Sequence, residues 1–280
     1  MIALIKTMEG LNMKTQSRKL GIFTAICLTG LFANKALATE SLLHDPESFS
    51  VEFENCQEFA GLYPVEISNV APFVPNDYII ASQDGTTALV VFRTAECAGA
   101  NITGDDNNPL PIENDPVILS QVGVAVVPPL GMGDVNNYTI HYGTNNKKLA
   151  GALKKIGIKA KLVKRLEFDY ESDDGVGSYF IENSSGRVRH VITGPASAPP
   201  TGEIGAPFVA NWWENGITGN VRMQTYIPEL RQGNAAEVIV TTEGWTIISD
   251  LLGGNISGPS VFGIRGIIPN ATMDVSIIEN

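Results

Sequence analysis

Lysine is the residue type in this 280-residue chain that is best suited to covalent chemistry. A lysine amine that loses its proton attacks ketones and keto acids to form an imine, and burial beside a second cation favours that neutral amine. Eight lysines and arginines fall between Lys147 and Arg165. Two of them, Lys159 and Lys161, are two residues apart and would share one face of a strand. Lys161 is therefore the candidate catalytic residue, and the alternative is a solvated lysine at a strand end.

A second group of side chains has the types that line ligand pockets. Trp212 and Trp213 are adjacent, and neighbouring residues of a strand face opposite sides, so one is expected to line a cavity while the other packs in a core. His141 and Tyr142 come just before the lysine-rich stretch. The candidate ligand pocket therefore includes His141, Tyr142, Lys159, Trp212 and Trp213.

One helix is predicted at about 146–156, within the lysine-rich stretch. Asn145 or Asn146 can cap its first turn, and Gly157 suits the left-handed residue that ends a helix. An apolar stripe at helical spacing lies between them, formed by Leu149, Ala152, Leu153 and Ile156. The lysines off this stripe indicate either a site for an anionic group or, more simply, a solvated helix face. A strand is expected to follow at 158–162.

The rest of the chain is typical of antiparallel sheets. Short segments rich in β-branched and aromatic residues recur at a spacing of roughly ten residues, with turn residues between them. They are 78–81, 86–94, 117–127, 138–142, 166–171, 177–182, 187–193, 221–227, 236–242, 261–268 and 273–278. A second, short helix is predicted at 245–252. Residues 39–75 contain many turn signals and are expected to wrap a single β domain at 76–280.

Three blocks of the sequence, in this order, resemble the acetoacetate decarboxylase superfamily. Residues 91–94 (VFRT) are similar to an early strand of the family, 142–162 to its helix-and-lysine block, and 257–271 to its closing strand. The resemblance implies a mainly β (α+β) fold, a cone-shaped antiparallel double barrel or sandwich that encloses an apolar pocket. It implies no cofactor.

The same resemblance implies that the residues of the family's reaction are not kept. In the family, the first of two adjacent lysines forms a Schiff base with the substrate. Ala160 stands at that position here, and only the second lysine, Lys161, is present. Gln121 stands where the family has its catalytic glutamate, and Gly85 where an arginine would bind the substrate carboxylate. The resemblance adds Gln121, and Arg93 of the VFRT segment, to the candidate ligand pocket.

The N-terminal residues indicate a secretory signal peptide over 1–38, with Met13 as an alternative start. Basic residues precede an apolar run at 20–32, and Ala36-Leu37-Ala38 has the form of a cleavage site. The apolar run is too short to predict a stable membrane span. The chain is therefore expected to be exported, to the periplasm or the cell exterior.

Composition limits the partners of the mature chain. Without residues 1–38, 14 basic side chains remain against 29 acidic ones, which disfavours nucleic acid and anionic membranes. Cys56 and Cys97 are its two cysteines, so an oxidising compartment favours a disulfide, and the alternative is two unlinked thiols. The histidines are isolated in sequence, and no metal site is predicted.

Three functions are consistent with these features. The leading hypothesis is an exported, non-catalytic protein that binds a small lipophilic or acyl ligand in its barrel. The first alternative is a lyase, decarboxylase or hydratase that acts on a small keto acid through Lys161. The second is a structural or interaction role. The oligomeric state is left open.

Overall fold

The computed structural model describes residues 48–104, 109–112, 116–173, 176–216 and 219–278. The predicted signal peptide at 1–38, and the first part of the predicted wrapping segment, lie outside the described residues.

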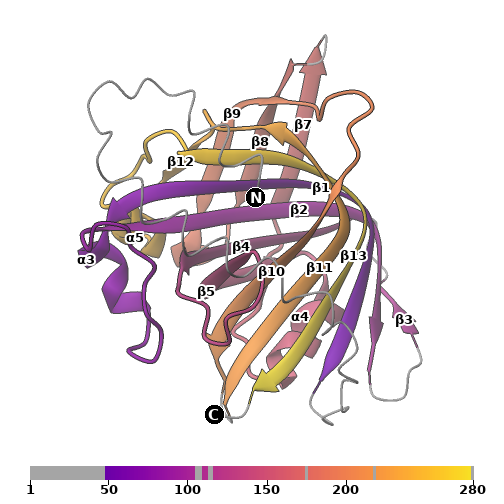
Figure 1. Cartoon of the computed structure of the whole chain (residues 1–280), viewed down its shortest axis with the longest axis horizontal. Coiled ribbons are helices and arrows are strands. Elements are labelled where there is room, and N and C mark those ends of the chain that lie inside the picture. The colour runs from indigo at the N-terminus through magenta and orange to yellow at the C-terminus, as the bar shows by residue number, and fades with distance from the viewer. Residues whose placement is uncertain (1–47, 105–108, 113–115, 174–175, 217–218, 279–280) are drawn as a thin grey trace. The chain divides into compact units, whose positions relative to one another are not determined.

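Within the described residues, seven long strands close into a barrel (Figure 1). They follow one another around the wall as β1 (Phe49–Glu66), β13 (Phe262–Ile278), β11 (Asn220–Asn234), β10 (Ala206–Asn215), β5 (Val135–Thr144), β4 (Val117–Ala125) and β2 (Thr87–Thr103), which pairs with β1 again. Neighbours are antiparallel except β5 and β10, which are parallel. Two short strands extend the wall, β3 (Pro109–Pro111) on β2 and β6 (Lys161–Leu162) on β5.

A second, four-stranded antiparallel sheet packs against the outside of this wall. It consists of β7 (Leu166–Asp173), β8 (Val176–Asn183), β9 (His190–Ser197) and β12 (Ile239–Thr242), in the order β12-β9-β8-β7. Between the sheets lies an outer cluster that includes Phe59, Phe92, Val122, Tyr179, Ile181 and Ile192. Short helical turns adjoin this layer: α3 (Ile67–Val70), η1 (Ala71–Phe73), η2 (Gly186–Val188) and α5 (Ile247–Leu252). The predicted mainly β class and barrel architecture are confirmed.

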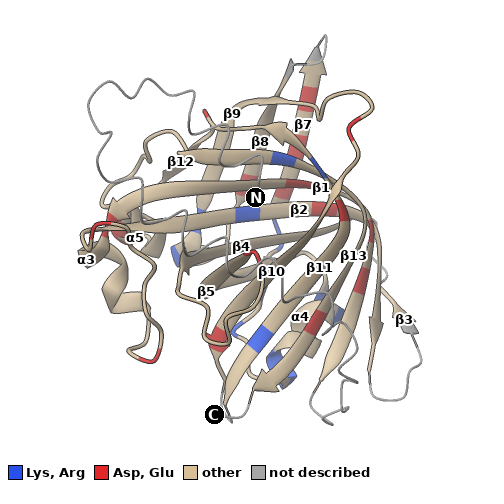
Figure 2. Cartoon of the chain, in the orientation of Figure 1, with Lys and Arg blue, Asp and Glu red and all other residues tan. Residues whose placement is uncertain are grey.

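The principal helix, α4 (Lys147–Lys155), closes one end of the barrel. Its cap is Asn146, whose side-chain oxygen accepts a hydrogen bond from the Leu149 amide, as the sequence indicated. Leu149 and Leu153 are buried in an interior cluster to which all seven barrel strands contribute, for example Val51, Leu119, Tyr142, Trp212, Met223 and Met273. The lysines on the opposite side of α4 are exposed, and basic positions gather there (Figure 2).

Three neighbouring strands bend at one level of the barrel. Residues of a regular strand that face the interior are two apart. Here the interior cluster contains Phe53 and Cys56 on β1, Cys97 and Ala100 on β2, and Ile268 and Ala271 on β13. In each pair the two interior residues are three apart, so each strand has one extra residue between them. The pairs are opposite one another in the register, so the extra residue occurs at the same level in all three strands. On β1 it includes Asn55, which has a left-handed φ of 49°.

The described part of the wrapping segment differs from the expectation. Residues 49–66 form β1, a central barrel strand that pairs with both β2 and β13. The alternation of buried and exposed residues along β1 changes phase at Asn55. The alternating pattern of apolar and polar residues that predicts a strand is therefore interrupted there. The strand expected at 158–162 is also shorter, because β6 begins at Lys161.

Candidate functional site

The barrel interior brings together a row of polar side chains from neighbouring strands. Arg93 on β2 is paired in register with Gln121 on β4, which is paired with Tyr142 on β5. Arg93 alternates with Val91 and Ala95, which belong to the interior cluster, so it faces the same side. The row lies among the apolar side chains of the interior cluster, where polar groups are costly unless they have partners.

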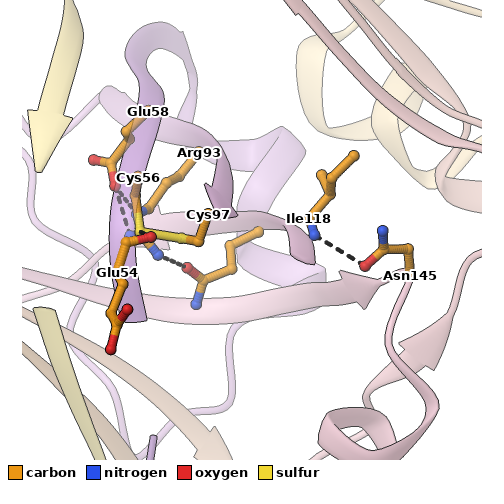
Figure 3. Close-up of a disulfide and its surroundings, with 8 residues drawn as sticks. Glu54, Cys56, Glu58, Arg93, Cys97, Ile118 and Asn145 are labelled. Atoms are coloured by element: carbon orange, nitrogen blue, oxygen red, sulfur yellow. Dashed lines mark hydrogen bonds and ion pairs between the residues drawn. A yellow bond between two sulfur atoms is a disulfide. The ribbon is translucent and has the colours of Figure 1, made fainter. Parts of the chain in front are cut away.

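Arg93 is neutralised by a buried carboxylate. Its Nε and Nη2 atoms lie 2.8 and 2.6 Å from Glu58 Oε2, and Nη1 donates to Gln121 Oε1 at 2.6 Å. The side chains of Arg93 and Glu58 are 11% and 4% exposed. Figure 3 shows this pair beside the disulfide between Cys56 and Cys97, whose sulfur atoms are 2.09 Å apart. The pair leaves no net charge in the interior, and all three contacts engage the guanidinium.

Three other buried donors of the wall have no acceptor among the described residues. They are the Tyr142 hydroxyl, the Trp212 indole N–H and the Thr139 hydroxyl, and the three residues are 1%, 1% and 5% exposed. Burial raises the pKa of Tyr142, so its hydroxyl remains a donor at neutral pH. A buried donor without an acceptor costs about 1–3 kcal/mol. Such a group calls for a water or ligand oxygen beside it.

Trp212 on β10 lies against Gly123 on β4, and β5 is the strand between them. A Cβ atom on Gly123 would come within 2.7 Å of Trp212 Cζ3 and 2.5 Å of the Tyr138 carbonyl oxygen. Gly123 is paired with Thr139, so these two residues of neighbouring strands share the face that Trp212 contacts. A glycine at position 123 therefore permits the close approach of the indole.

The end of the barrel opposite α4 has an apolar rim. Residues that are only partly buried pack there against the interior cluster, and they come from the strand ends farthest from α4. They are Ala60, Leu62, Ala125, Val135, Phe208 and Phe262. Leu62 is paired with Val91, the interior-facing residue of β2 that lies next to Arg93 on the side away from α4.

Two of the predicted pocket residues lie on the other face of the wall. Trp213 belongs to the outer cluster, and its Nε1 donates to Asn136 Oδ1 at 3.0 Å. His141 Nε2 lies 3.2 Å from Asn183 Nδ2 on β8, in the layer between the sheets. Burial, with smaller contributions from His190 and Lys161, lowers the pKa of His141 to about 3. The structure thus places neither residue with Tyr142 and Trp212.

The two candidate lysines point to water. The Lys159 side chain is 78% exposed, with Nζ 3.9 Å from Glu214 Oε1, and Lys161 is also exposed. Ala160 between them is fully buried and belongs to the interior cluster. Glu214 also accepts a hydrogen bond from the Lys159 amide at 3.1 Å, and its burial raises its pKa to about 6. Of residues 159–161, Ala160 is the one that belongs to the interior cluster.

Sequence reasoning missed Glu58 and Thr139. Glu58 lies two residues after the interior-facing Cys56, so recognition of β1 as a barrel strand would have placed its carboxylate inside. Thr139 lies within a predicted strand, but the pairing of β4 and β5 shifts beside Gly123, and a simple alternation assigns the face incorrectly beyond such an irregularity.

The described residues contain no group of three or more His, Cys, Asp and Glu side chains that could hold a metal ion. They also contain no helix that is long and apolar enough to cross a membrane.

Comparison with known proteins identifies the fold. No family model and no curated protein sequence matches the chain. Among solved structures, it is similar to an acetoacetate decarboxylase, with a TM-score of 0.50 and 10% identity over 81% of this chain and 88% of that one. It is also similar to an acetoacetate decarboxylase-like enzyme from Sphingomonas wittichii RW1, with a TM-score of 0.50 and 9% identity over 86% and 96% of the two chains. The family resemblance is confirmed at the level of architecture: the chain has the fold of the acetoacetate decarboxylase superfamily.

Proposed function

We propose that the protein binds a small, neutral, lipophilic molecule inside the barrel, and that a carbonyl-type oxygen of this ligand accepts hydrogen bonds from the wall. The observation that carries the proposal is the set of buried donors without acceptors, Tyr142, Trp212 and Thr139. A carbonyl or ester oxygen takes up to two such hydrogen bonds, and the apolar interior cluster suits the rest of an acyl or alkyl chain.

The charge of the interior favours a neutral ligand over an acid. Arg93 is the cation of the polar row, and Glu58 already compensates it in a buried ion pair. A carboxylate in the same space would add an uncompensated negative charge, which is expensive at low dielectric. A ketone, aldehyde, ester or amide brings the oxygen without that cost.

The proposed role is binding without covalent catalysis. An imine-forming lysine must present a neutral amine to the ligand. The side chain that reaches the interior at the relevant position is Ala160, and the Lys161 side chain is exposed. The alternative of a lyase working through Lys161 therefore has no support from the position of its amine.

Export is part of the proposal. It rests on the signal-like sequence at 1–38 and on the pairing of Cys56 with Cys97, since disulfides persist mainly in oxidising compartments. A mature N-terminus near Thr39, found by mass spectrometry of protein recovered from its own host, would support it. An N-terminus at Met1 or Met13 would oppose it.

Native mass spectrometry of the mature protein, purified from its own host, tests the binding role. We expect a co-purifying small molecule that is neutral and contains a carbonyl or ester group. We expect Tyr142→Phe to lose part of this occupancy, because it removes one unpartnered donor. The control is Tyr226→Phe on the exposed side of β11, which should retain it. An empty barrel, or a carboxylic acid in it, would contradict the proposal.

A further inference from the structure

We propose a second binding site, for a small oxyanion that carries a carboxylate or phosphate group, in a cleft on the outer face of the barrel. The cleft has a volume of about 460 Å³. It is lined by Asn55, Cys56, Gln57, Arg231, Arg265, Ile267, Ile268 and Pro269, from β1, β11 and β13. The site is separate from the proposed interior site and does not depend on it.

Arg265 is the central residue of this cleft. Its guanidinium carbon lies 3.5 Å from the centroid of the Tyr170 ring on β7, so the planar group is held against a planar surface. Nη2 reaches Gln57 Oε1 only at 3.4 Å, and the buried Nε has no hydrogen-bond partner among the described residues. No carboxylate of the described residues forms a salt bridge with Arg265 at 4.0 Å or less. Arg265 also forms a side-chain hydrogen bond with Tyr179, and its buried Nε is the donor that remains without a partner among the described residues.

Arg231 adds a second cation to the same wall. Its Nε donates to Glu229 Oε1 at 2.7 Å, in a pair whose side chains are 42% and 43% exposed. The residues that line the cleft include two arginines and no acid. The neighbouring acids are Glu229, which pairs with Arg231, and Glu96, which is paired in register with Gln57. Guanidinium groups with free N–H pairs bind carboxylate and phosphate oxygens in bidentate fashion, which defines the ligand class.

The shape of the cleft follows from the bend in the barrel wall. Residues 55–57 and 267–269 lie at the level where β1 and β13 change the phase of their alternation. Gln57, Ile267 and Arg231 are paired across β1, β13 and β11, and they form one row of the outer surface. The amide groups of Asn55 and Gln57 supply further hydrogen-bond donors beside the arginines.

Isothermal titration calorimetry of the mature protein with inorganic phosphate, and separately with succinate, tests the site. We expect saturable binding of at least one anion. Arg265→Gln should weaken it about tenfold, because a charge-assisted hydrogen bond is lost. Arg231→Gln should weaken it about threefold, because Arg231 is exposed and already shared with Glu229. The matched control is Arg187→Gln, which removes an equal charge from an exposed position outside the cleft and should leave the affinity unchanged.

Binding of phosphate alone would assign the site to phosphorylated ligands, and binding of succinate alone to carboxylates. Arg265→Lys keeps the positive charge but removes the paired N–H donors of the guanidinium, so it should also weaken binding. Thermal melts of each variant establish that the variant is folded. If Arg265→Gln does not fold, the Arg231→Gln result decides. Absence of binding to both anions, or an equal loss in Arg187→Gln, would overturn the proposal.

Discussion

Cys56 and Cys97 face each other across β1 and β2, with their Cα atoms 4.0 Å apart, at the level where three barrel strands bend together. Both side chains belong to the interior cluster, so the disulfide links β1 and β2 at the level of this shared bend. It also lies beside the ion pair of Arg93 and Glu58 (Figure 3). The sequence separation of the two cysteines is 41 residues.

Reduction of this disulfide should destabilise the folded protein by about 4 kcal/mol, because closing a loop of this length restricts the unfolded chain. Urea unfolding with and without reductant measures the difference. The double variant Cys56→Ala with Cys97→Ala is the control, and its transition should not respond to reductant. A wild-type transition that is equally insensitive, with two thiols that alkylate after unfolding, would contradict the prediction.

Arg93→Leu should destabilise the protein by about 3–5 kcal/mol, since it leaves the Glu58 carboxylate buried and unpaired. Adding Glu58→Leu should recover most of this loss, because the second substitution removes the uncompensated charge. Arg231→Leu, from the exposed pair with Glu229, should cost no more than about 1 kcal/mol. Chemical denaturation of the variants measures these values. A double variant no more stable than Arg93→Leu would show that the two residues do not act as a pair.

Local signals in the sequence were sufficient for part of the fold. Helix α4 was predicted within one residue at each end, because its cap at Asn146, its apolar stripe and Gly157 are neighbours in the chain. The strand β1 was missed because the alternation of its inward-facing and outward-facing residues changes phase at Asn55. Gly61 and Pro64 also resemble turn signals. A bend shared by three strands depends on pairings between distant residues, which a single sequence does not reveal.

The candidate site was predictable to a similar degree. Arg93, Gln121, Tyr142 and Trp212 are all on the interior side of the wall. His141 and Trp213 were proposed with their sequence neighbours, but adjacent strand residues face opposite sides, and the sequence does not say which face is inside. The partner of Arg93 was not predictable, since Glu58 is 35 residues away and on a strand that was not recognised.

Acid should destabilise the protein through its two buried histidines. Burial lowers the pKa of His141 to about 3 and that of His190 to about 4. In the unfolded chain both titrate near 6.5, so below that pH the unfolded state binds protons that the folded state does not. Each histidine should therefore lower the free energy of unfolding by about 2 kcal/mol at about pH 5 relative to pH 7. Glu214, with a pKa raised to about 6, binds its proton more readily when folded and offsets about 1 kcal/mol of this loss.

The variant His190→Gln isolates one of these contributions. Its free energy of unfolding should fall by about 2 kcal/mol less than that of the wild type between pH 7 and about pH 5. Urea titrations at each pH provide the comparison. Equal pH dependence in the two proteins would mean that His190 titrates normally in the folded state.

Acetoacetate and borohydride should leave no stable adduct on the wild-type protein. Lys161 is exposed, so nothing removes water from its ammonium group. The informative variant is Ala160→Lys, which introduces an amine into the buried interior cluster, where burial favours the neutral, nucleophilic form. We expect an adduct in that variant by intact-protein mass spectrometry. A wild-type adduct that disappears in Lys161→Ala would establish the lyase alternative instead.

The most direct test of the interior site compares a neutral ketone with the acid of the same chain length. Tryptophan fluorescence is followed while the mature protein is titrated with 2-nonanone or with nonanoate. We predict that the ketone binds about tenfold more tightly, and that Tyr142→Phe weakens ketone binding about fivefold, equivalent to one hydrogen bond of about 1 kcal/mol. Tyr226→Phe should bind as the wild type does. Tighter binding of nonanoate, or ketone binding that Tyr142→Phe leaves unchanged, would contradict the account.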